Sequence, residues 1–324
     1  MGVALPVEII GRVIQLILDS QPKRNVAILL PLLLVSPTFR YEAERLIYAQ
    51  ITLRNLPQVV KCFTAICKRP HLGRAVRSLT VSLSLNSTAP PIDFWQIFGF
   101  DGNAIGNTAA QNSTGRGARH VGRVLKPFGA LVERTLAKLT HLQEYSLTLG
   151  GPVGRDEDHF APVWLPSKAP FKLQRFVVDL NLSRFMANFL LSQRNITDLL
   201  APHFQPSRVS NMNLLRPSAL PRLRGIVARS GVAAVLAPGR PLRRVCLKDG
   251  AHNDVTLQQA VAALPQLAKA TVPVRFYDIS VPDSTAVQEA LLEPLGTHLP
   301  SLEVLTVRRT FVGDEVSLSK VAIR

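Results

Sequence analysis

The chain has 324 residues, of which 47% are hydrophobic and 19% are charged, so it can bury a large core and is not disordered as a whole. Its 24 prolines and 19 glycines follow no fixed period, which excludes collagen and long coiled coils. The 38 basic and 22 acidic residues leave a net charge of +16, which attracts nucleic acid, anionic lipid or an acidic protein.

Neither the cysteines nor the apolar segments indicate secretion or a membrane span. The three cysteines, Cys62, Cys67 and Cys246, are too few and too scattered for a disulfide framework. The longest apolar run, residues 26–35, contains Pro31 and has about half of the roughly twenty residues that a membrane span needs. We therefore expect a cytoplasmic or nuclear protein that has no membrane partner.

The first fifty residues predict three short helices, each with one apolar face. Apolar residues recur at helical spacing in the first helix, which Pro6 opens: Ile10, Val13, Ile14, Ile17 and Leu18. A second helix is expected to begin after Asn25 and to end or kink near Pro31, and Ser36 with Pro37 opens a third. Such a small module would leave apolar surface to bury against something else.

The order of these residues resembles the F-box found at the start of many basidiomycete fungal proteins. The matching pieces are Leu5-Pro6-Val7-Glu8-Ile9-Ile10, Leu34-Val35-Ser36-Pro37-Thr38-Phe39-Arg40, and Ala43 with Ile47-Tyr48. The resemblance implies that residues 1–54 dock on the adaptor subunit of an SCF-type cullin–RING ubiquitin ligase. The docking residues that we predict are Leu5, Pro6, Ile9, Ile10, Val13, Leu34, Val35 and Phe39. Each of them has an equally simple interpretation as part of the core of the module itself.

Beyond residue 54, short β-like runs alternate with helical segments. Strands are predicted at 51–53, 76–83, 142–149, 173–180, 223–227, 242–247, 274–279 and 302–307, and helices at 57–67, 121–138, 256–264 and 284–295. Several strands follow a Leu-x-x-Leu cue, such as Leu220-Pro-Arg-Leu and Leu299-Pro-Ser-Leu, which is typical of leucine-rich repeats. The leading leucines stand 31, 50, 19, 25 and 35 residues apart, so the repeats are irregular.

These patterns predict an α/β fold in two parts. A helical F-box-like module at 1–54 is followed by a degenerate leucine-rich-repeat-like solenoid at 55–324, with a loop insertion at 84–117. The segment Arg69-Pro70-His71-Leu72, followed by Val76-Arg77-Ser78-Leu79, is similar to the junction that leads into the first leucine-rich strand of the same fungal family.

Motifs for catalysis were not found. The chain lacks G-x-S-x-G, His-Glu-x-x-His, Cys-x-x-Cys and a phosphate loop that ends in Gly-Lys-Ser/Thr. The seven histidines are solitary, so none has a helical partner for binding a metal. We therefore predict a protein that is not an enzyme and that holds no cofactor and no metal.

The net charge is concentrated in residues 194–248, which contain ten basic residues and one acidic residue, Asp198. We predict that successive repeats stack seven of these arginines into a basic face: Arg216, Arg222, Arg224, Arg229, Arg240, Arg243 and Arg244. Because arginine binds carboxylate and phosphate through two parallel hydrogen bonds, this face would receive an acidic or phosphorylated protein substrate. Two alternatives stay open, namely ordinary solvated repeat edges and a basic nucleic-acid-binding solenoid, although only 6% of the residues are aromatic.

Overall fold

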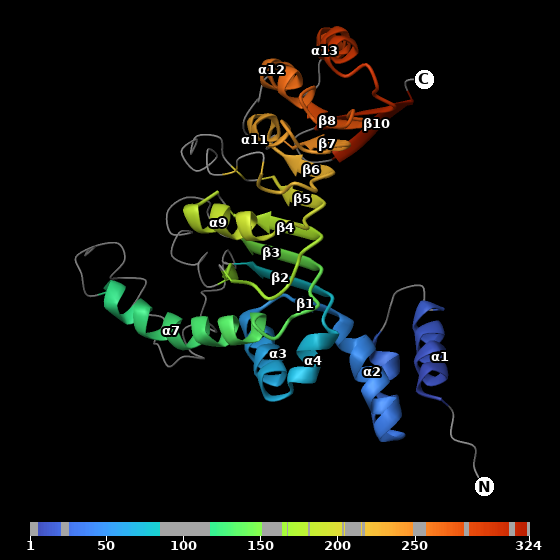
Figure 1. Ribbon diagram of the computed structural model, residues 1–324, viewed down its shortest axis with the longest axis vertical. Coiled ribbons are helices and arrows are strands. Elements are labelled where there is room, and N and C mark those ends of the chain that lie inside the picture. The colour runs from blue at the N-terminus through green and yellow to red at the C-terminus, as the bar shows by residue number, and fades with distance from the viewer. Residues whose placement is uncertain are drawn as a thin grey trace. The chain divides into compact units, whose positions relative to one another are not determined.

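The computed structural model describes residues 6–20, 26–84, 117–150, 164–166, 168–180, 182–202, 204, 215, 218–248, 257–281, 285–310 and 315–322 (Figure 1). The contacts within the chain define two compact units. The first comprises Met1–Leu83 with Ser87–Glu144, and the second comprises Ser84–Asn86 with Tyr145–Arg324. The boundary predicted at residue 54 lies inside the first unit, and the loop insertion predicted at 84–117 lies almost wholly outside the described residues.

The fold is α/β, as predicted, with helices at the start of the chain and then alternating strands and helices. The strands follow one another in the sheet in chain order. They are β1 (Gln50–Leu53), β2 (Ser78–Ser84), β3 (Glu144–Gly150), β4 (Arg175–Asp179), β5 (Asp198–Ala201), β6 (Gly225–Ala228), β7 (Arg244–Leu247), β8 (Phe276–Val281), β9 (Val304–Thr310) and β10 (Glu315–Ala322). β1 and β2 pair in parallel, β4 to β9 pair in parallel in succession, and β10 pairs with β9 in antiparallel fashion. This arrangement is consistent with leucine-rich repeats.

The first unit begins with short helices whose ends match local signals in the sequence. The helices are α1 (Val7–Asp19), η1 (Val26–Leu29), η2 (Pro31–Leu34), α2 (Pro37–Ala49), α3 (Leu56–Lys68), α4 (Pro70–Ala75) and α7 (Gly117–Leu136). Ser36 caps α2 by accepting a 3.3 Å hydrogen bond from Phe39 N. The second predicted helix is instead two 3₁₀ turns, η1 and η2, because Pro31 lacks the N–H that would continue an α-helix.

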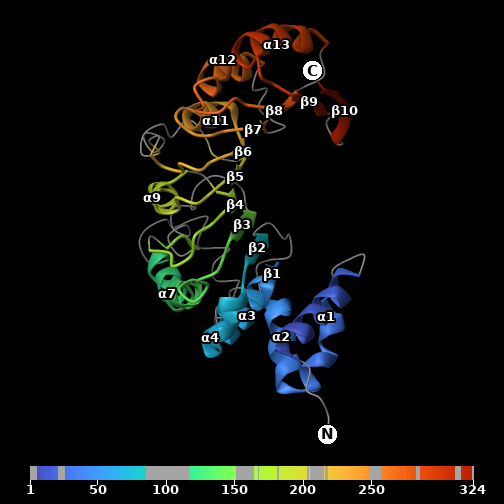
Figure 2. The same ribbon diagram turned by 45° about the vertical axis from the view of Figure 1, so that its right-hand side comes forward.

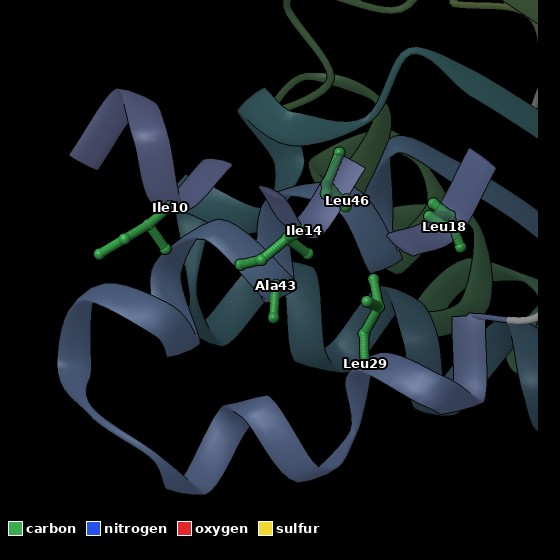
Figure 3. Packing of buried hydrophobic residues seen from close by; sticks show 6 residues of the cluster. All are labelled: Ile10, Ile14, Leu18, Leu29, Ala43 and Leu46. Atoms are coloured by element: carbon green, nitrogen blue, oxygen red, sulfur yellow. The ribbon is translucent and has the colours of Figure 1, made fainter. Parts of the chain in front are cut away.

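A small hydrophobic core holds α1, α2 and η1 together. Figure 3 shows six buried members of this core, namely Ile10, Ile14, Leu18, Leu29, Ala43 and Leu46. Leu32, Leu33, Phe39 and Ile47 are partly buried and pack against it. The helical module therefore has its own core, and its three α1 members recur at four-residue steps along one face.

The second unit alternates its strands with α9 (Arg184–Ser192), α11 (Ser230–Leu236), α12 (Leu257–Leu267) and α13 (Thr285–His298). Figures 1 and 2 show α9, α11 and α12 on the same side of the strands. Along the described parts of β4 to β9, buried side chains alternate with half-buried or exposed ones, as in β7, where Val245 and Leu247 are buried and Arg244 is exposed. The buried set packs under the helices, so the other face of the sheet is open within the described residues.

Strand β5 explains the irregular spacing of the predicted repeats. No strand was predicted between the one that begins at Leu173 and the one that begins at Leu223, 50 residues later, but Ile196 is buried and lies two residues before β5. With Ile196 included, this stretch becomes two units of 23 and 27 residues, which fall within the usual length of a leucine-rich repeat.

Candidate functional site

Helix α1 has a second apolar face that the core of the module does not cover. Ile9, Val13 and Leu16 are 49%, 45% and 54% exposed. They follow one another at steps of four and three residues, so they line one side of α1 next to the buried side that carries Ile10 and Ile14. We call Ile9, Val13 and Leu16 the outer face of α1.

The segment before α2 exposes further aliphatic side chains. Leu34 is 84% exposed and Val35 is 61% exposed, whereas the preceding Leu32 and Leu33 pack against the core of the module. Arg40 of α2 donates a 2.9 Å hydrogen bond from Nε to Leu33 O, which ties this segment to the helix that follows. Ten of the large hydrophobic side chains that are exposed in the described residues lie between residues 7 and 41.

The eight predicted docking residues fall into three groups. Pro6, Ile9, Val13, Leu34 and Val35 are exposed, whereas Ile10 is buried and Phe39 is half-buried against the core. Leu5 lies outside the described residues. Ile10 and Phe39 therefore support the module from within, and Leu16 belongs to the exposed face although it was not predicted. Leu16 could have been predicted, because it follows Ile9 by seven residues and therefore lies on the same side of the helix.

A groove of about 460 Å³ lies between α1 and α2, and charged side chains are part of its lining. Gly11 is part of the lining, and an added Cβ there would lie 2.9 Å from Glu42 Oε2, so a side chain at this position would push the Glu42 carboxylate aside. Glu42 is buried and is paired with Arg45 Nε at 2.9 Å. Glu8 and Arg12 add one charge of each sign to the lining, so the groove favours neither cations nor anions.

In the second unit, the residue that precedes each parallel strand occupies an equivalent place. Its carbonyl accepts hydrogen bonds from two backbone N–H groups, one of the residue just before the next strand and one of the first residue of that strand. Arg224 O accepts in this way from Arg243 N at 2.8 Å and from Arg244 N at 2.9 Å. We call these six residues the pre-strand row: Gln174, Thr197, Arg224, Arg243, Arg275 and Glu303. Neighbouring members are separated by one strand spacing, about 4.8 Å.

Side chains in this row can reach one another across a single strand spacing. Arg275 Nη1 lies 3.1 Å from Glu303 Oε1, and both side chains are half exposed. Arg275 was not predicted, because it lies beyond the basic stretch at 194–248. Its place between Val274 and Phe276, just before a strand, is the same as that of Arg243 and would have identified it.

The next position along the strands carries a second ion pair. Asp198, Gly225 and Arg244 are in register on β5, β6 and β7, and Arg244 Nη2 lies 2.7 Å from Asp198 Oδ1. Thr197 Oγ1 donates a 2.8 Å hydrogen bond to the other oxygen of the same carboxylate. Asp198, the single acid of the basic stretch, is therefore occupied by contacts within the chain.

Arg240 does not belong to a surface face, which corrects the prediction. The side chain is buried and donates hydrogen bonds to the backbone carbonyls of Ala219, Leu236, Pro238 and Leu215. Burial lowers the pKa of Arg240 to about 10. No local pattern indicates this burial, because a buried arginine and an exposed one follow a loop glycine equally well.

The other predicted basic residues occupy different environments. Arg222, Arg224, Arg243 and Arg244 are exposed. Arg229 is half-buried at the start of α11, and its Nε donates a 3.4 Å hydrogen bond to Pro202 O. Arg216 lies outside the described residues. Of the seven predicted arginines, Arg224 and Arg243 are the two that combine exposure with adjacent places in the pre-strand row.

The described residues contain no group of three histidine, cysteine or acidic side chains that could hold a metal ion. Within the same residues, no helix combines the length and the apolar character that a membrane crossing requires. Comparison of the chain with protein-family models and with curated protein sequences gives no match.

Proposed function

We propose that the chain is a substrate-recognition adaptor of an SCF-type cullin–RING ubiquitin ligase. In this proposal the helical module at residues 1–54 docks on the adaptor subunit of the ligase, and the strand-and-helix region captures a protein substrate. The protein performs no bond chemistry. It raises the local concentration of the substrate beside the enzyme that carries ubiquitin.

One observation carries the docking part of the proposal. The module has a complete small core and still exposes Ile9, Val13 and Leu16 along one side of α1, with Leu34 and Val35 exposed before α2. Clustered exposed aliphatic side chains are characteristic of a surface that binds another protein. The sequence of the same residues is the part that resembles an F-box.

The substrate part is supported by the open face of the sheet and by its exposed arginines. In leucine-rich and related repeat folds, stacked units present one extended surface along their strands. An acidic or phosphorylated protein is the partner that exposed arginines such as Arg224 and Arg243 favour.

Capture of the adaptor subunit tests the docking claim directly. The intact chain carrying Ile9→Asp and Val13→Asp should no longer retain the purified adaptor, because two carboxylates would be desolvated in an apolar contact. A matched control carries Val235→Asp and Leu292→Asp, which place the same charges on exposed aliphatic positions of α11 and α13. Equal retention of the adaptor by the two double variants would refute the docking claim.

A nucleic-acid-binding solenoid is the second candidate, and the exposed Arg222, Arg224 and Arg243 favour it. Binding of this kind weakens steeply with salt, because each neutralised phosphate releases counterions. Titration of the chain with single-stranded RNA and duplex DNA at about 50 mM salt tests it. No measurable binding under that condition eliminates this function.

A further inference from the structure

Arg224 and Arg243 stand side by side in the pre-strand row. Arg243 N donates a 2.8 Å hydrogen bond to Arg224 O, so their Cα atoms belong to adjacent, equivalent positions of the stack. Both side chains are exposed. Like charges on directly neighbouring strands repel each other, so this pair is unfavourable until an anion lies between or beside them.

The neighbouring arginines already have acidic partners from the chain itself. Arg244 is paired with Asp198 at 2.7 Å, and Arg275 is paired with Glu303 at 3.1 Å. Within the described ranges, no carboxylate lies at ion-pair distance from Arg224 or Arg243. This surface therefore pairs two of its four adjacent arginines internally and leaves the two central members of the row for an external anion.

We propose that Arg224 and Arg243 bind two carboxylates of an acidic segment, rich in Asp and Glu, in the protein that the second unit captures. The proposal rests on the proposed function, which supplies the protein substrate. Each guanidinium offers a planar pair of N–H groups that matches one carboxylate. Arg244 and Arg275, on the same surface, each already contact one carboxylate of the chain.

The surroundings favour an acidic protein over a nucleic acid. Single-stranded nucleic acids bind through successive aromatic side chains on which bases stack, together with positive charge. Phe276 is the one aromatic side chain that is exposed on the described strands. One aromatic beside two free arginines suits a short acidic segment and not an extended run of stacked bases.

A binding measurement on the purified full chain tests the proposal. The probe is an oligo-glutamate peptide, followed by calorimetry, with three comparison probes: the same peptide with Gln for Glu, a phosphoserine-containing Gln peptide, and single-stranded DNA. Arg224→Ala with Arg243→Ala should weaken binding of the oligo-glutamate peptide by about tenfold or more, because hydrogen bonds between charged groups are lost. The matched control is Arg184→Ala with Lys269→Ala, which removes two exposed charges from α9 and from the turn after α12.

The proposal is supported if the oligo-glutamate peptide binds, the Gln peptide does not, and only the Arg224/Arg243 double variant is weakened. Equal weakening by the control variant would mean general attraction to net charge and would overturn it. Selective binding of the phosphoserine peptide, or DNA binding that depends on the same two arginines, would also overturn it. Because this measurement uses no ligase subunit, its failure is separate from a failure of the adaptor capture that tests the proposed function.

Discussion

Arg244 reaches Asp198 from two strands away, with Nη2 and Oδ1 2.7 Å apart. The two residues lie on β7 and β5, and Gly225 of β6 lies between them in register. An added Cβ at Gly225 would lie 2.5 Å from Asp198 Oδ1 and 3.6 Å from Arg244 Nε. The absence of a side chain at Gly225 is therefore what gives this ion pair its space.

Gly225→Val should displace the Asp198 carboxylate from Arg244 and destabilise the protein by up to about 1 kcal/mol, because the displaced group is the end of a flexible side chain in a partly exposed ion pair. If Asp198 is the obstacle, Gly225→Val combined with Asp198→Ala should cost less than the sum of the two single changes. Urea denaturation of the four proteins measures this coupling. Strict additivity of the two changes would contradict the steric explanation.

Arg240 should be far more important for stability than its exposed neighbour Arg243. Arg240→Met keeps much of the volume but removes the donors to the carbonyls of Ala219, Leu236 and Leu215. Buried carbonyls that lose their partners cost about 1–3 kcal/mol each, so we expect a loss of at least about 3 kcal/mol in the free energy of unfolding.

Arg243→Met is the matched control for this experiment, since it removes the same charge from an exposed site. It should change the free energy of unfolding by less than about 0.5 kcal/mol. The structural role assigned to Arg240 would be wrong if the two variants unfolded at the same urea concentration.

The sequence was a good guide to the alternation of strands and helices, because buried residues of the strands recur with a period of two. Most of its strand starts were about two residues early, since the second leucine of a Leu-x-x-Leu cue, such as Leu223, is buried before the strand begins at Gly225. β5 was missed because Ile196 stands where a leucine was sought. α11 was missed because its seven residues are too short for a helical period to be recognised.

The site was less predictable than the fold, because charge alone does not say where a side chain points. Arg240 and Arg243 are three residues apart in a basic stretch, yet one is buried against backbone carbonyls and the other is exposed. Likewise, Ile9 and Ile10 are adjacent and chemically identical, but 49% and 6% of their surfaces are exposed. The difference between Arg240 and Arg243 arises from packing between elements, which no local pattern contains, whereas the four-residue spacing of Ile10, Ile14 and Leu18 already indicates the buried side of α1.

The two sides of α1 should respond differently to truncation. Ile14 is fully buried in the core of the module, so Ile14→Ala should lower the free energy of unfolding by about 2–4 kcal/mol through lost burial and a cavity. Val13→Ala removes exposed surface only and should cost less than about 0.5 kcal/mol. Thermal unfolding monitored by circular dichroism compares the two. A loss of stability in Val13→Ala as large as that in Ile14→Ala would show that Val13 is not a free surface residue.

Cys62 of α3 should react slowly with alkylating agents at ordinary pH. Burial raises the pKa of Cys62 from its ordinary value of 9.0 to about 11, because the charged thiolate is poorly solvated there. The thiolate is the reactive form, so labelling of native Cys62 by iodoacetamide should reach half its maximal rate near pH 11. Mass spectrometry of the peptide that contains Cys62 follows the reaction, and the same protein in urea, where the midpoint should fall near 9, is the control.

The same shift has a consequence for stability. Because the pKa of Cys62 is higher in the folded protein than in the unfolded one, its contribution is complete below pH 9 and is lost as the pH rises from 9 to about 11. Cys62→Ala should therefore reduce the decline in the free energy of unfolding over this range. If native and urea-unfolded protein instead share one labelling midpoint near pH 9, the Cys62 thiol is solvated in the folded state and neither effect should occur.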